Sequence, residues 1–161
     1  MPTLSTNAEA STRPTDSDAR ATLPYSVRME PTPHDLLGGR DAVLALANRF
    51  YDAMERGEPE LTAVHDCKAP GKVSDATRER FGLFLVGWLG GEQQYMERFG
   101  HPRLRMRHRA VPINIAMRDA WLRAMTTAMD EAGVAGDVRT FLDERFAHVA
   151  NFLRNVPEEE A

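Results

Sequence analysis

The residues with the most unusual spacing lie in HPRLRMRHR, from His101 to Arg109, which holds four arginines, two histidines and no acid. The chain as a whole is acidic, with 24 Asp and Glu against 20 Lys and Arg. A solvated basic patch is the plainest interpretation. Alternate arginines can also follow the phosphates of a nucleic acid, although no second basic surface supports this. In a third interpretation, the arginines and a histidine face one small anionic ligand.

Haem fits the third interpretation, because one neutral imidazole can hold its iron while cations meet the two propionates. No other metal centre is indicated. No two histidines have the i, i+4 spacing of a helical zinc site, and His65 with Cys67 offers too few ligands for structural zinc. The chain also lacks GxSxG, a phosphate-binding glycine loop and CxxC, so hydrolase, nucleotide-binding and redox-thiol functions have no support.

The elements that must position these residues are helical. From about residue 33 onward, apolar residues recur at helical spacing, which predicts an all-α domain. We expect a helix that ends near Gly57, a short turn from Pro59, a helix from Ser74 to Gly90-Gly91, a short helix closed by Gly100, and long helices over 116–132 and from an N-cap at Asp137. The segments 68–73 and the stretch around Pro112 are predicted loops.

Composition divides the chain into three parts. Residues 1–32 are rich in Ser, Thr, Pro and Ala and predict a disordered N-terminal arm. Residues 33–156 form the predicted helical domain, and 157–161 an acidic tail. The single cysteine favours a reducing, cytoplasmic setting. No apolar run approaches the length of a membrane span, and a net charge of −4 argues against nucleic acid as a partner.

Two aromatic residues with polar tips are predicted to point inward. Tyr51 adjoins Phe50 on the inner stripe of its helix, and Trp121 lies on a helix face otherwise filled by Met and Ala. A buried hydroxyl or indole N–H needs an acceptor. Each alone is read most simply as an ordinary core aromatic. Beside a haem ligand, the same two donors would converge on one ligand-binding site.

These residues belong to longer motifs that resemble a known family. The motifs are GHPRLRMRH at 100–108, the pair Pro112-Ile113 and RDAWLRAM at 118–125. With LLGG at 36–39 and NRFYDAM at 48–54, they resemble the signature of the group II truncated haemoglobins. The glycine pairs at 38–39 and 90–91 resemble those that let shortened helices fold two-over-two around haem. The resemblance covers about 33–156 and implies a truncated globin fold with haem b as cofactor.

The resemblance also implies roles for individual residues. His108 matches the proximal iron ligand, and its second ring nitrogen needs an acceptor, which we expect to be a carbonyl near Leu104 or Arg105. Tyr51, Trp121 and His65 match distal residues that donate hydrogen bonds to the bound ligand, in that order of importance. The other residues expected around the cofactor are Thr77, Phe81, Phe84 and Ile113 in the pocket, and Arg80, Tyr95 and Arg105 at the propionate edge.

The function implied is binding of O2 and other diatomic ligands at a five-coordinate iron with a polar distal pocket. Such a site suits redox chemistry of oxygen, NO or peroxide better than bulk transport, and NO dioxygenase or peroxidase-like turnover stays open. Expected partners are O2, NO, CO or sulfide and an unidentified reductase, for a monomer or a homodimer. The alternatives are a haem-based sensor, a sulfide-binding globin, or a haem-free helical interaction module.

Overall fold

The computed structural model describes residues 30–158. The expectation of a disordered arm therefore lies outside the described residues, except at its last three positions. There, the side chain of Thr32 accepts a hydrogen bond from the Asp35 N–H, and Asp35 accepts one from the Thr32 N–H, which forms a capping box for the first helix. Thr32 therefore takes part in the start of the first helix, as its N-cap.

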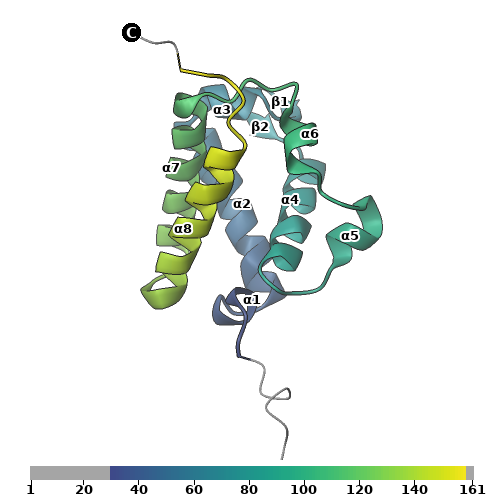
Figure 1. Ribbon diagram of the computed structural model, residues 1–161, viewed down its shortest axis with the longest axis vertical. Coiled ribbons are helices and arrows are strands. Elements are labelled where there is room, and N and C mark those ends of the chain that lie inside the picture. The colour runs from purple at the N-terminus through teal and green to yellow at the C-terminus, as the bar shows by residue number, and fades with distance from the viewer. Residues whose placement is uncertain (1–29, 159–161) are drawn as a thin grey trace, which may run out of the picture. The chain divides into compact units, whose positions relative to one another are not determined.

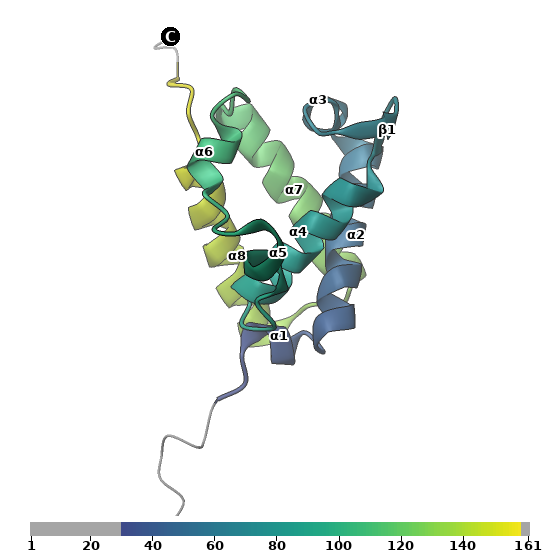
Figure 2. The same cartoon turned by 90° about the vertical axis from the view of Figure 1, so that its right-hand side faces the viewer.

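Four long helices form two layers (Figures 1 and 2). Helix α2 packs against α4 in one layer, α7 packs against α8 in the other, and α2 also packs on α7. Short elements connect these helices. The order is α1 (Pro33–Leu36), α2 (Arg40–Gly57), α3 (Pro59–Ala63), β1 (Cys67–Ala69), β2 (Lys72–Val73), α4 (Asp75–Trp88), α5 (Gln94–Phe99), α6 (Leu104–His108), α7 (Ile115–Glu131) and α8 (Gly136–Phe152).

The predicted apolar stripes form the core. On α2, the residues that follow one another at helical spacing are all buried, and they meet buried methionines of α7 and apolar residues of α4 and α8. The buried residues that carry these contacts include Val43, Ala47, Phe50, Met54, Leu85, Met125, Met129, Leu142 and Phe146. The mostly helical fold class predicted from the sequence is confirmed.

The second glycine pair lets α1 lie directly against the end of α4. The His34 N–H donates to the Leu89 carbonyl at 3.0 Å, which brings α1 onto the turn that follows α4. Gly90 has φ +101°, and a Cβ there would lie 2.8 Å from the Thr32 side chain. A Cβ on Gly91 would lie 2.5 Å from the His34 ring. Side chains at these two positions would force the helices apart.

Two local predictions are wrong. Residues 67–73 form a two-stranded antiparallel hairpin, in which Cys67 pairs with Val73, and not a plain loop. Glu55 on α2 holds it, because its carboxylate accepts from the Val73 N–H at 2.9 Å. Asp137 does not cap α8, because the helix begins earlier: Ala135 is the N-cap, and Asp137 lies in the first turn.

None of the helices within residues 30–158 combines the length and the apolar composition that crossing a lipid bilayer requires.

The close approach at Gly91 leads to a stability prediction. Gly91→Ala should lower the free energy of unfolding by about 1–3 kcal/mol, because the new methyl group overlaps the His34 ring and Val86. Urea unfolding followed by circular dichroism measures the change. Gly57→Ala is the matched control, since Gly57 has no atom near its Cβ position, and it should be neutral or slightly stabilising. Equal destabilisation by both variants would contradict the packing argument.

Candidate functional site

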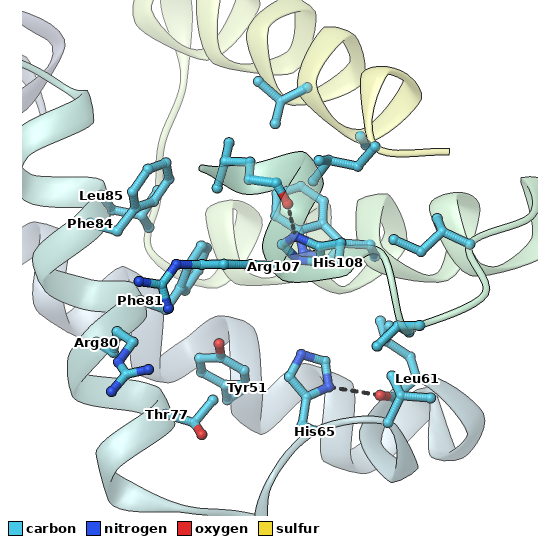
Figure 3. A pocket seen from close by; sticks show the side chains of 18 of the residues that line it. Tyr51, Leu61, His65, Thr77, Arg80, Phe81, Phe84, Leu85, Arg107 and His108 are labelled. Carbon is cyan, nitrogen blue, oxygen red and sulfur yellow. Dashed lines mark hydrogen bonds between the residues drawn. The ribbon is translucent and has the colours of Figure 1, made fainter. Parts of the chain in front are cut away.

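A cavity of about 530 Å³ opens within the helical domain and is lined mainly by apolar and aromatic side chains (Figure 3). Its volume lies in the range of ligand and cofactor pockets. Its walls come from α2 to α8, from the segment that follows α3 and from the loop between α6 and α7. The residues predicted from the sequence that line it are Tyr51, His65, Thr77, Arg80, Phe81, Phe84, Tyr95, His108, Ile113 and Trp121. Arg105 is the one predicted site residue that does not.

His108 enters the cavity from the last turn of α6 with a defined tautomer. Its Nδ1 lies 2.6 Å from the Leu104 carbonyl oxygen, one helical turn earlier. A carbonyl can only accept, so Nδ1 carries the proton and Nε2 of the neutral ring keeps its lone pair. This is the arrangement that an imidazole needs to ligate a metal. The expectation of an acceptor near Leu104 or Arg105 is confirmed, and the acceptor is Leu104.

Asn155, just beyond α8, holds the chain around His108 in place. Its Nδ2 donates to the His108 carbonyl at 3.2 Å and to the Val111 carbonyl at 2.9 Å. Its Oδ1 accepts from the Ile113 N–H at 2.7 Å, and its own N–H donates back to the Ile113 carbonyl. One side chain therefore connects the end of α8 to α6 and to the loop that leads into α7. Sequence analysis missed Asn155, since its partners lie more than forty positions away.

Tyr51 and Trp121 bring polar tips to the same cavity. Tyr51 is buried, and its ring contacts those of Phe50, His65 and Phe81 at centroid distances of 5.0–5.7 Å. Burial raises the pKa of the Tyr51 phenol far above its usual value, and the positive charge of Arg78 only partly opposes this. The hydroxyl therefore stays protonated and available as a donor. Trp121 packs against Phe50 at 5.1 Å, so Phe50 contacts both Trp121 and Tyr51.

His65 has the opposite hydrogen-bonding polarity. Its Nδ1 lies 2.8 Å from the Leu61 carbonyl, so Nδ1 carries the proton and Nε2 is an acceptor (Figure 3). Burial lowers the pKa of the His65 imidazole, the Leu61 hydrogen bond opposes this, and a proton on His108 would lower the pKa further. The ring is therefore neutral near pH 7. The structure places His65 in the cavity as predicted, but its Nδ1–H is used by Leu61, so the neutral ring offers a ligand only the acceptor Nε2 and no donor.

The cationic edge of the cavity differs from the one predicted. Arg80 lines the cavity and stacks over Phe99, with 4.6 Å from the guanidinium carbon to the ring centroid. Arg105 points away and stacks over Phe152 at 4.3 Å. Arg107 takes its place. The reason is helical spacing: Leu104, Arg107 and His108 share one face of α6, whereas Arg105 is turned about 100° from Leu104. That spacing was available in the sequence and would have favoured Arg107.

Within residues 30–158, no three His, Cys, Asp or Glu side chains come together to hold a bare metal ion. The cavity offers only two imidazoles with a free Nε2, those of His108 and His65, and such a small donor set suits a metal that brings most of its own ligands. A porphyrin iron is such a metal, since its macrocycle fills four positions and the protein supplies one histidine. The residues present therefore fit haem.

Comparison with known proteins agrees with this site. A family model described as bacterial-like globin matches residues 32–155. The group 2 truncated hemoglobin YjbI of Bacillus subtilis is 34% identical over 128 residues, which cover 80% of this chain and 92% of that protein. The crystal structure of the group II truncated hemoglobin from Bacillus anthracis is 32% identical with a TM-score of 0.70, covering 82% of this chain and 97% of that one.

A third relative is the truncated oxygen-avid haemoglobin from Bacillus subtilis, whose X-ray structure is 33% identical with a TM-score of 0.68 and covers 77% of this chain and 99% of that one. The chain belongs to the bacterial-like globins, and among them to the group II truncated haemoglobins. Membership of a haemoglobin family implies a haem cofactor, in agreement with the donor set.

The contacts of Asn155 generate a prediction. Asn155→Ala removes three side-chain hydrogen bonds that hold α6 and the following loop. Because these bonds are solvent-exposed, we expect a combined loss near 1.4 kcal/mol and about tenfold faster haem release to an acceptor protein. Asn151→Ala is the control, because Asn151 lies four residues before Asn155 and its side chain bonds Arg118 of α7, with no bond to α6 or to the loop that follows it within residues 30–158. Unchanged haem release in Asn155→Ala would show that these bonds do not position His108.

Proposed function

We propose that this globin binds haem b through His108 and uses the cavity to bind O2 and other small ligands next to the iron. The observation that carries the proposal is the convergence on one aromatic cavity of an imidazole with a free Nε2 and two neutral donors, Tyr51 and Trp121. A relative's description as oxygen-avid supports it. Bound haem supplies an iron with one coordination position free for an exogenous ligand.

The residues that would hold haem come from both layers. Aromatic side chains of α4 and α7 would pack on the macrocycle, and Ile113 lines the same cavity as His108. Arg80 and Arg107 are the cations available to the propionates, with the buried Tyr95 nearby on α5. Because both arginines are exposed, each such contact should contribute only a few tenths to about 1 kcal/mol.

The distal side chains would act on the ligand by hydrogen bonding. Tyr51 Oη and Trp121 Nε1 are donors, and O2 next to ferrous iron draws negative charge onto its atoms. Each charge-assisted hydrogen bond would contribute about 1.5–3 kcal/mol. Two such donors favour slow O2 release, and slow release suits redox reactions of oxygen, NO or peroxide better than bulk transport.

The polarity of His65 favours a second class of ligand. Its Nε2 accepts a hydrogen bond, so it cannot stabilise O2 in its neutral form. A ligand that carries its own proton, such as hydrogen sulfide or hydrogen peroxide, can donate to this nitrogen. Binding of a protic ligand is therefore the second candidate function, and it uses the same cavity with His65 in place of Tyr51 as the main polar contact.

The role of His108 can be tested by substitution. His108→Ala should lose most of its haem, because the substitution removes the α6 imidazole that would hold the iron. The protein should also become less stable by the lost binding energy. Absorption spectra of the ferric, deoxy-ferrous and CO forms measure the loss. His148→Ala on the exposed face of α8 is the control and should keep the parent spectrum. A normal histidyl haem spectrum in His108→Ala would disprove the assignment.

The donor roles can be tested by ligand release. Tyr51→Phe and Trp121→Phe each remove one donor, and each should speed O2 dissociation about ten- to a hundredfold. The double variant should exceed the product of the two, because in each single variant the remaining donor can reorient. Flash photolysis should show a much smaller effect on CO, which carries little negative charge. If O2 leaves the double variant no faster than the parent, the oxygen-binding proposal fails.

A further inference from the structure

The four arginines of the α6 segment are unusual in their surroundings. Arg103, Arg105, Arg107 and Arg109, named here the α6 basic patch, are all exposed. Elsewhere in the described domain, most arginines are paired with acids, as in Arg78 with Glu55 at 2.8 Å and Arg123 with Glu58 at 2.7 Å. Isolated exceptions are Arg40, which bonds Gln94, and Arg80 and Arg145, which lie over aromatic rings. Within residues 30–158, no carboxylate reaches salt-bridge distance of the α6 basic patch. A protein of net charge −4 thus concentrates free positive charge on one short helix.

The outer side of this helix also offers apolar contact area. A groove of about 510 Å³ runs between α6 and the end of α8, lined by Arg105, Met106, Arg109, Leu153, Arg154 and Asn155. Met106 is 53% exposed, and Phe152, over which Arg105 stacks, is 47% exposed. An exposed apolar centre within a charged rim is the composition of a transient protein interface.

The position of the groove relates it to the cofactor site. Leu104 and His108 face the cavity from α6, whereas Arg105, Met106 and Arg109 face the groove. The groove therefore lies on the outer side of the same short helix that supplies the iron ligand. Asn155 lies between the two, since it lines the groove and bonds the His108 carbonyl.

We infer that the α6 basic patch and its groove dock an acidic one-electron donor protein of the flavodoxin or iron–sulfur class. The inference rests on the proposed function. The docked donor would pass one electron to the ferric haem iron, which becomes ferrous, while the donor is oxidised by one electron and no proton moves. Charge complementarity selects an acidic partner and speeds its encounter. It disfavours a second copy, whose equivalent patch would face this one across a two-fold axis.

The test uses the haem-loaded ferric protein, a reduced flavodoxin with a strongly acidic surface, and CO to trap the ferrous product in a stopped-flow instrument. The second-order rate constant should fall about tenfold as NaCl rises from about 50 to about 500 mM. Arg105→Glu with Arg109→Glu should lower it about tenfold at low salt. Arg49→Glu with Arg56→Glu makes the same charge change on α2 and should lower it no more than about twofold.

Two further measurements separate docking from reactivity. Reduction by dithionite, a small reductant that needs no docking, should be alike in all three proteins. Titration with oxidised flavodoxin, followed by NMR, should shift signals of α6 and of the end of α8 in the parent and not in Arg105→Glu with Arg109→Glu.

Several outcomes would overturn the inference while leaving the proposed function intact. They are a reduction rate independent of salt, equal losses in the two double variants, and NMR shifts confined to another surface. Tighter binding of a short DNA duplex than of flavodoxin, or self-association through α6 at low salt, would assign the patch to another occupant. Failure of the proposed function is seen separately, as the absence of a haem absorption spectrum before any donor is added.

Discussion

The hydrogen bond between His108 Nδ1 and the Leu104 carbonyl determines what this cavity can bind. It keeps the proton on Nδ1 and leaves Nε2 with a free lone pair, which is the state that a metal ligand requires. Helix α6 has few residues of its own to maintain that geometry. The bonds from Asn155 to the His108 and Val111 carbonyls supply the missing rigidity from the end of α8. The proximal side thus depends on hydrogen bonds more than on packing.

The distal side depends on packing. Phe50 is almost completely buried, and it contacts Tyr51, Phe81 and Trp121 at centroid distances of 5.0–5.2 Å. A close-packed ring of this kind transmits any change of volume to its neighbours. The two donors are therefore held by the same aromatic residue that anchors α2 in the core. Packing against Phe50 holds Tyr51 and Trp121 at the cavity, and neither side chain makes a hydrogen bond within the described part of the chain.

The two histidines of the cavity show how one local motif supports different roles. In each, Nδ1 bonds the carbonyl four residues earlier, Leu104 for His108 and Leu61 for His65. Each therefore presents an acceptor nitrogen. On the α6 side that nitrogen suits a metal, whereas on the α3 side it suits a protic ligand. The cavity combines acceptor nitrogens of its histidines with donors from Tyr51 and Trp121. The donors would favour O2, and the free acceptor of His65 would favour a ligand that carries its own proton.

The arginines of α6 likewise divide by direction. Arg107 lies with Leu104 and His108 toward the cavity, and Arg105 and Arg109 line the outer groove. A row of alternate charges that looks uniform in the sequence is split by the helix into one residue near the cofactor site and others on the surface. Within the α6 basic patch, Arg107 would thus serve the cofactor first, and Arg105 and Arg109 would contact the partner in the groove.

Helical periodicity was enough to predict the mostly helical fold and the stripe of α2. The presence of Tyr51, His108 and Trp121 at one cavity was predicted by the resemblance of longer motifs to a known family. These follow from local rules: apolar spacing fixes which face of a helix is buried, and long motifs limit the family. The hairpin at 67–73 depends on Glu55 from another helix, and the support of His108 depends on Asn155. Only the folded chain brings these partners together. The polarity of His65 was also decided there, because a tautomer depends on which atom lies at hydrogen-bond distance, and no spacing of residues specifies that.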